Sequence, residues 1–193
     1  MKFLLGLSRF IDSVNEWVGR GVYWLILVSV LVSSGNAVVR YSLSRSSNGW
    51  LEIQWYLFSA VFLLGAGYTL RHNEHVRIDI FYSRLKPRTR AWIDILGGIF
   101  FLLPMTLIIL SFAWPMFVDS WVLNEYSTDA GGLIRWPVKL LIPVGFALLL
   151  AQGVSEIVKR IAFLLGLIPD PGVRRAHGEL DEIVEQQIGD AKS

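Results

Sequence analysis

The sequence contains no cysteine among its 193 residues, which excludes disulfide bonds, thiolate metal sites and cysteine nucleophiles. Histidine is also scarce, and none of the three histidines lies in a long apolar stretch, so haem held between two helices by imidazoles is excluded. The sequence has neither a phosphate-binding loop nor a nucleophile motif. We therefore predict that the protein is not an enzyme, carries no cofactor or metal, and binds no nucleic acid.

Charged residues are few, at 18% against about 25% in an average soluble domain, whereas 53% of residues are hydrophobic and the mean hydropathy is +0.49. A helix needs about 20 apolar residues to cross a hydrocarbon core of about 30 Å. Four stretches meet that length, at about residues 21–39, 51–70, 95–118 and 136–158. The composition therefore predicts an all-α membrane protein, with four transmembrane helices in a domain spanning residues 19–168.

The lysines and arginines predict the orientation of these helices. Fourteen of the eighteen lie before the first span, between the second and third, or after the fourth. Because cytoplasmic loops carry the excess of Lys and Arg, we predict that both termini are cytoplasmic and that the protein is a multi-pass membrane protein. The first nineteen residues lack the uninterrupted apolar core of a signal peptide, so we do not expect them to be one.

Two segments flank the predicted membrane domain. Residues 1–18 place apolar side chains at helical spacing on one face, with Lys2, Arg9, Asp12 and Glu16 opposite. This pattern predicts an interfacial amphipathic helix in the cytoplasmic headgroup plane, or alternatively a surface helix against a partner. Residues 169–193 follow a Pro-Asp-Pro-Gly break, and a weaker apolar stripe there predicts a short helix in a cytoplasmic tail.

The predicted spans hold few polar groups, although a transporter that moves its own solute needs them near the midplane. In the first span, Ser29, Ser33 and Ala37 are spaced by four and predict a seam of small residues that suits close helix packing. In the fourth span, Pro143 removes a backbone donor and predicts a bend.

Glu52 is an acidic residue at the lip of the second span. Three roles remain open for it: an interfacial carboxylate that reaches water, one half of an ion pair with a partner subunit or with Arg40, or a carboxylate that couples transport to protons.

The densest polar run is Arg71–Asp79. If the second helix continues past Leu70, then Arg71, His75 and Asp79 lie four apart along one line and would cap that helix. A metal site formed by His72, Glu74, His75 and Asp79 is conceivable, but a third histidine and cysteine are both missing nearby.

Several short motifs occur in the order and spacing of a known family. They are Glu52, the patch Gly65-Ala66-Gly67, the run His75-Val76-Arg77-Ile78-Asp79, and Ile142-Pro143-Val144-Gly145. Together with the four-span layout, they make residues 10–160 resemble the small permease subunit of tripartite ATP-independent periplasmic (TRAP) transporters, the DctQ-type family. Glu74 departs from the pattern, since the family often has a small residue before the histidine.

The resemblance implies a three-part importer. A periplasmic solute-binding protein captures an organic acid, and a large membrane subunit moves it in an elevator fashion, driven by sodium that binds there. The small subunit is then a non-catalytic scaffold, embedded among membrane lipids, that braces the large subunit and helps dock the binding protein. Two other classes remain as alternatives: an autonomous four-helix proton-coupled exporter that uses Glu52, and the membrane anchor of a redox enzyme.

Overall fold

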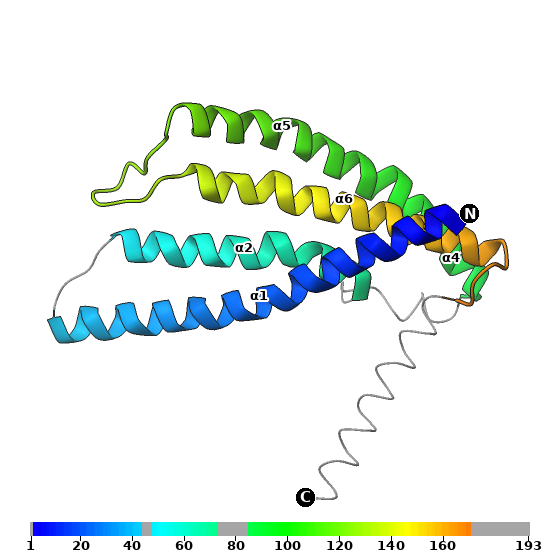
Figure 1. Cartoon of the computed structure of the whole chain (residues 1–193), viewed down its shortest axis with the longest axis horizontal. Coiled ribbons are helices and arrows are strands. Elements are labelled where there is room, and N and C mark those ends of the chain that lie inside the picture. Colours follow the sequence, from blue (N-terminus) through cyan, green and yellow to red (C-terminus); the bar gives the residue numbers. More distant parts are fainter. Residues whose placement is uncertain (1, 44–47, 73–84, 171–193) are drawn as a thin grey trace, which may run out of the picture.

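The computed structural model describes residues 2–43, 48–72 and 85–170, which are almost entirely helical (Figure 1). In chain order the elements are α1 (Lys2–Leu43), α2 (Asn48–His72), α4 (Pro87–Gly97), the π-helix η1 (Gly98–Leu102), α5 (Leu103–Val122) and α6 (Trp136–Leu164). The elements α4, η1 and α5 follow one another without a break, so four helical stretches are long and apolar enough to cross a membrane. The prediction of four such helices is confirmed.

The first helix differs from its prediction. We expected a separate helix over residues 1–18 followed by a span from residue 21, whereas α1 is a single helix of 42 residues. No proline interrupts it, and polar side chains in its first half bond to α2 and α6, as described below. At 1.5 Å per residue α1 is about 63 Å long, roughly twice the hydrocarbon thickness. The interfacial position of its first half stays a prediction, but its separation from the span was wrong.

The third helical stretch also begins earlier than predicted, at Pro87 rather than near residue 95. A proline is well tolerated in the first turn of a helix, where its missing N–H would have no partner. The predicted C-terminal helix lies outside the described residues.

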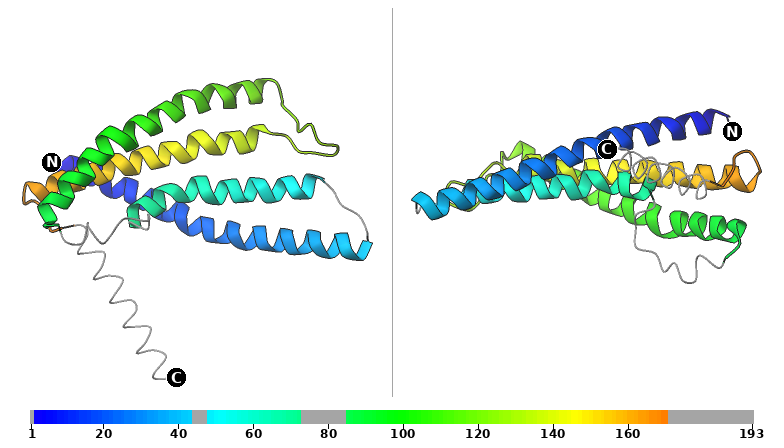
Figure 2. Two further views of the ribbon diagram at one scale, coloured as in Figure 1. Left: turned by 180° about the vertical axis from the view of Figure 1, so that it is seen from behind. Right: turned by 90° about the horizontal axis from the view of Figure 1, so that it is seen from below.

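The four long helices are arranged as a row rather than as a closed bundle (Figure 1). α1 packs on α2, α2 on α6, and α6 on α5. The first half of α1 also crosses over to α6, and the edge-on view shows the helix ends fanning apart near the N-terminus (Figure 2). We call the end where α1 begins and α6 finishes the N-terminal end, and the opposite one the loop end, after the α5–α6 loop. Many large apolar side chains of the four long helices are consequently exposed.

Close backbone contacts hold the centre of the row. A Cβ added at Gly145 of α6 would lie 2.7 Å from the carbonyl oxygen of Leu63 on α2. On the other side of α6, Gly153 receives the side chain of Leu102 from η1. Small residues of this kind let helix backbones approach each other in lipid, where no hydrophobic effect drives them together.

The π-helix ends two residues before Pro104, a residue that cannot donate a backbone hydrogen bond. The hydroxyl of buried Thr106 donates to the carbonyl oxygens of Leu102 and Leu103, at 2.8 and 3.0 Å. The helix thus widens just before the proline, and the Thr106 hydroxyl adds hydrogen bonds to two carbonyls of the adjoining turn.

We predict that Gly145→Ala separates α2 from α6 and destabilises the protein by about 1–3 kcal/mol, the usual cost of overpacking. Thermal unfolding in detergent, followed by circular dichroism, measures the effect. Gly21→Ala is the matched control, because a Cβ at Gly21 would meet nothing within 4 Å. Equal unfolding temperatures for the two variants would contradict the close α2–α6 contact.

Candidate functional site

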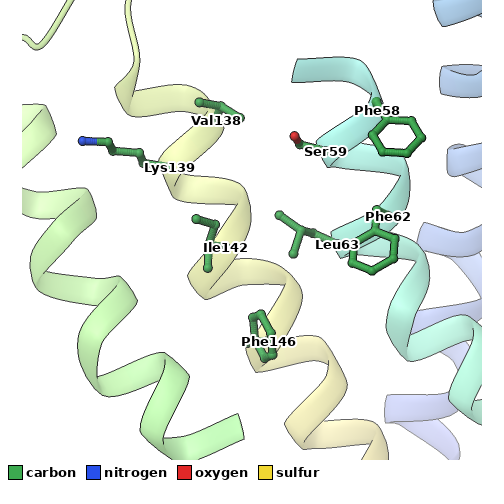
Figure 3. A pocket seen from close by; sticks show the side chains of 8 residues that line it. All are labelled: Phe58, Ser59, Phe62, Leu63, Val138, Lys139, Ile142 and Phe146. Atoms are coloured by element: carbon green, nitrogen blue, oxygen red, sulfur yellow. The ribbon is translucent and has the colours of Figure 1, made fainter. Parts of the chain in front are cut away.

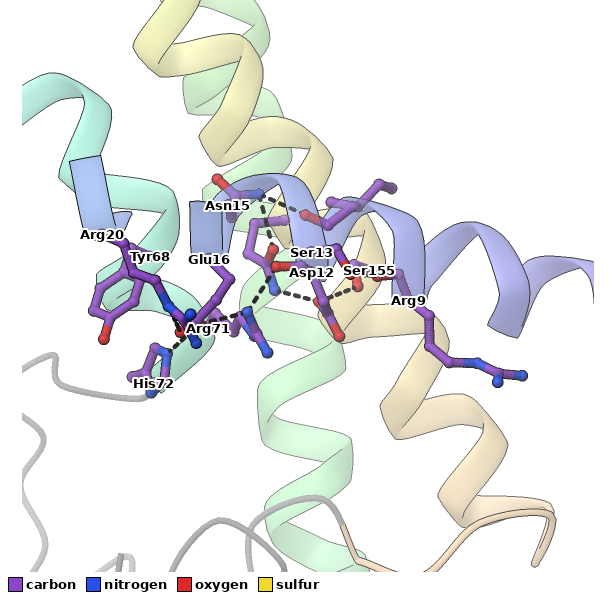
Figure 4. A network of polar contacts seen from close by, with 12 residues as sticks. Arg9, Asp12, Ser13, Asn15, Glu16, Arg20, Tyr68, Arg71, His72 and Ser155 are labelled. Atoms are coloured by element: carbon purple, nitrogen blue, oxygen red, sulfur yellow. Dashed lines mark hydrogen bonds and ion pairs between the residues drawn. The ribbon is translucent and has the colours of Figure 1, made fainter. Parts of the chain in front are cut away.

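Polar side chains gather at the N-terminal end, where α1, α2 and α6 meet (Figure 4). We call this group the N-terminal polar cluster; its members are Ser8, Asp12, Asn15, Glu16, Arg71, His72, Gln152, Ser155, Glu156 and Lys159. The cluster forms from polar residues at helical spacing on two helices, α1 and α6. On α1 the positions 8, 12, 15 and 16, and on α6 the positions 152, 155, 156 and 159, each form one helical face.

Asp12 is the centre of the contact between α1 and α6. Its carboxylate accepts hydrogen bonds from both sides of the α6 face: from the Lys159 ammonium at 3.0 Å to each oxygen, from the Gln152 amide at 2.9 Å, and from the Ser155 hydroxyl at 3.0 Å. Lys159 also donates to Glu156 at 2.7 Å. Each charged group of this contact therefore has a partner of opposite charge, as charged groups in a membrane protein require.

Asn15 and Gln152 form the most deeply buried part of the cluster, at 1% and 0% exposure. The Asn15 amide donates to Gln152 Oε1 at 3.0 Å, while its own Oδ1 has no hydrogen-bond partner and lies against Gly67 of α2. A Cβ at Gly67 would collide with that amide. The glycine thus allows α2 to approach the α1–α6 contact.

Glu16 connects α1 to the last turn of α2. Its Oε2 accepts a hydrogen bond from Arg71 at 2.6 Å and lies 3.0 Å from His72 Nε2. Arg71 also donates to the backbone oxygen of Asp12 at 2.7 Å, and the His72 ring stacks on Tyr68 with centroids 4.2 Å apart. These contacts fix the end of α2 against the middle of α1.

A further ion pair lies near the end of α6. The Arg160 side chain is only 7% exposed, and it contacts Asp94 of α4 at 3.1 Å and Asp170 at 3.4 Å. It anchors the start of the third helical stretch to α6.

The second polar site is at the loop end and is built around Glu52, in the first turns of α2. The hydroxyl of Ser127 donates to Glu52 Oε1, and the backbone N–H of Leu133 donates to Oε2 at 2.5 Å. Both donors belong to the α5–α6 loop, residues 123–135. In this geometry Glu52 holds a loop of its own chain, a role that was not considered from the sequence, and the three roles considered there stay untested.

Two more α2 side chains contact the same loop. The Tyr56 hydroxyl donates to the carbonyl oxygen of Ile134 at 3.0 Å, and the Asn48 amide donates to that of Ala130 at 3.1 Å. Gly132 is needed there, because a Cβ would lie 2.8 Å from Glu52 Oε1. The loop is therefore fixed by α2, although the chain connects it to α5 and α6.

Glu125 ties the loop to the start of α6. Its carboxylate pairs with Lys139, and Arg135 lies 3.8 Å away. The hydrogen bond from Lys139 lowers the pKa of Glu125, so this carboxylate is ionised at neutral pH. Glu125 thereby pairs with both Arg135 and Lys139 and offsets one of their two positive charges.

Between these sites, α2 and α6 diverge and leave a groove of about 420 Å³ (Figure 3). Its walls are mainly apolar, with Phe58, Phe62 and Leu63 on α2 and Ile142 and Phe146 on α6. Along the face of α2 that meets α6, Glu52 and Tyr56 contact the loop and Leu63 contacts Gly145, so the groove is bounded at both ends.

The residues singled out from the sequence have different positions. Arg71 belongs to the N-terminal polar cluster, Glu52 to the loop site, and Gly67 and Gly145 to close helix contacts, while Pro143 is buried inside α6. A Cβ at Gly65 would make only an ordinary contact with Val22. Glu74, His75 and Asp79 lie outside the described residues, so the predicted ladder and the conceivable metal site stay untested.

The predicted seam on α1 is only partly engaged. Ser29 is half-buried, and Ser33 accepts a hydrogen bond from Gln54 of α2, whereas Ala37 is exposed. Within residues 2–43, 48–72 and 85–170, no group of three or more His, Cys, Asp or Glu side chains could hold a metal ion.

The main omission of the sequence analysis was the N-terminal polar cluster. Asp12 and Glu16 were assigned to the solvated face of an interfacial helix, and Gln152 and Lys159 were not singled out. The signal was present as matching polar faces on α1 and α6. The two faces meet because α1 continues as one helix across α6, and this course could not be inferred from the local sequence.

These features define a class: a multi-pass membrane protein whose polar side chains join its helices to one another and to their loop. The chain belongs to the family of tripartite ATP-independent periplasmic transporters, DctQ component, which it matches over residues 29–163. It is thus a small permease subunit of a TRAP transporter, and the family implies association with a large permease subunit and a solute-binding protein. No curated protein and no solved structure matches the chain.

We predict that Lys159→Ala destabilises the protein by about 3 kcal/mol, the lower end of the range for breaking a buried ion pair, because it leaves Asp12 and Glu156 unneutralised. Replacing Asp12 and Lys159 together by alanine should cost less than the sum of the single changes. Chemical unfolding in detergent measures all three variants.

Arg20→Ala is the control, since Arg20 pairs with Glu16 but its side chain is 74% exposed. It should cost less than about 1 kcal/mol, as surface ion pairs do. Additive losses in the double variant would show that Asp12 and Lys159 do not act as a pair.

Proposed function

We propose that this chain is a scaffold subunit: it braces the large permease subunit and helps dock the periplasmic solute-binding protein, and solute does not pass through it. The transporter is a sodium-coupled importer of organic acids in a bacterial inner membrane, with sodium bound by the large subunit. Both termini of this chain lie in the cytoplasm.

The observation that carries the proposal is the distribution of charge along the helices. Residues 21–39, 53–70, 95–118 and 140–155 contain no charged side chain at all. The ionisable groups of the described helices lie toward the two ends of the row, and those of the N-terminal polar cluster bond to one another. A solute or ion pathway needs polar groups within the membrane, usually on broken helices, and these segments do not offer them.

The shape of the row supports the same proposal. An open row leaves both of its sides apolar and exposed, so one side can face lipid while the other packs against a larger membrane protein. Its stiffness comes from polar contacts at both ends and glycine contacts at the centre. Such a structure suits a part that holds another protein still.

The alternative exporter needs Glu52 to take up and release protons from a pathway. Glu52 instead accepts hydrogen bonds from Ser127 and Leu133 at one end of α2. This geometry favours a structural carboxylate over a coupling one.

We predict that the purified chain, reconstituted alone into lipid vesicles, gives no sodium-driven uptake of organic acids. Adding the large subunit and the solute-binding protein should establish uptake in the vesicles. Radiolabelled solute accumulation measures both conditions, and vesicles holding the large subunit without this chain are the control. Uptake or proton-driven efflux by this chain alone would overturn the scaffold proposal.

A further inference from the structure

The α5–α6 loop is unusually well fixed for a connection of its length. Residues 123–135 form thirteen linking residues, whereas most connections are about 4–6 residues long, and longer ones commonly have a function of their own. Inside the loop, Ser127 N–H donates to the Leu133 carbonyl at 2.9 Å and Arg135 N–H to that of Glu125 at 2.8 Å. The loop is thus a small hairpin with its own backbone hydrogen bonds.

Internal bonds do not fix the position of this hairpin relative to the helices; α2 does. Glu52, Tyr56 and Asn48 supply four hydrogen bonds to the loop, at Ser127, Leu133, Ile134 and Ala130. Glu52 alone makes two of them, on two segments of the hairpin six residues apart. Its removal therefore frees both sides of the hairpin at once.

The surface that the fixed hairpin presents is acidic and partly apolar. Leu123 and Tyr126 are 76% and 65% exposed. Asp129 of the loop and Asp119, on the last turn of α5 that leads into the loop, are exposed, and neither forms an ion pair in the part of the chain that the structure describes. The nearby cations, Arg135 and Lys139, are already engaged by Glu125. Irregular backbone of this kind does not lie in hydrocarbon, so the surface faces water.

We propose that Glu52 is a positioning residue: by holding the loop 123–135 against α2, it presents an acidic and partly apolar surface to a basic face of the periplasmic solute-binding protein. The inference rests on the scaffold function proposed above and names the surface through which docking occurs. Electrostatic complementarity with Asp119 and Asp129 steers the two proteins together, and the ordered loop avoids the cost of fixing it on binding.

The first measurement is the order of the loop. Because the chain has no cysteine, Thr128→Cys gives a single site for a spin label in the otherwise unchanged protein. Glu52→Ala should convert an immobilised spectrum into a mobile one. Glu52→Gln should restore order, since the amide oxygen accepts from Leu133 N–H and the Ser127 hydroxyl can reverse to accept from the amide. A mobile spectrum for Glu52→Gln would show that charge, and not the hydrogen bonds, is required.

The second measurement is the affinity of the purified solute-binding protein for the assembled complex in nanodiscs. If Glu52→Ala leaves the loop in its competent position about a tenth of the time, the Kd rises about tenfold. Maximal uptake at saturating binding protein should stay near that of the unchanged complex. The Kd of the Glu52→Gln complex should stay within about threefold of that of the unchanged complex. Asp129→Asn should raise the Kd and weaken the dependence of the Kd on salt.

Arg20→Ala is the control, because it removes the exposed partner of an ion pair at the opposite end of the row. It should leave the Kd unchanged. An unchanged Kd for Glu52→Ala with a mobile loop would show that the hairpin is not the docking surface. Failure of the unsubstituted complex to bind the solute-binding protein would count against the scaffold function itself, so the two failures are distinguishable.

Discussion

The hydrophobic effect does not drive helices together in lipid, because lipid tails are as apolar as leucine side chains. Association must come from close backbone contact and from polar groups that have no better partner. This chain uses both: Gly145 meets the backbone of Leu63 at the centre of the row, and Asp12 gathers Lys159, Gln152 and Ser155 near its N-terminal end. The open row, its apolar sides and its separated polar sites all follow from this constraint.

Placing the polar contacts at the ends has a mechanical consequence. The row is held at three levels, by the N-terminal polar cluster, by the glycine contacts at Gly67 and Gly145, and by the bonds of Glu52 and Tyr56 to the loop. Between the last two levels α2 and α6 diverge into the apolar groove. A helix pair fixed on both sides of a gap resists shear, a property that the proposed scaffold function would require.

The number and class of the long helices were predictable from the sequence, because hydrocarbon thickness sets a minimum length of apolar residues that composition reveals directly. The course of α1 was not. An amphipathic segment followed by an apolar one reads as two helices, and both Gly19 and Gly21 lie at the expected junction. In the structure Gly19 lets the ring of Tyr68 pack against α1, and the helix continues through both positions. Gly19 therefore allows a contact between two helices and does not form a turn. The local sequence is the same in both cases, because the difference depends on the presence of Tyr68 on α2.

The two sites differ in how much of them the sequence could reveal. Glu52 stood out because a carboxylate at the lip of a span is rare, yet its partners Ser127 and Leu133 are ordinary loop residues, 75 and 81 positions away. Asp12 did not stand out, since a charged face on an amphipathic segment normally faces water. What separates a solvated carboxylate from one that joins helices is the presence of matching donors on another element. For Asp12 these are on α6, about 140 residues later in the chain. In a membrane protein with so few charges, a polar helical face is therefore better compared first with the polar faces of the other helices than assigned to solvent.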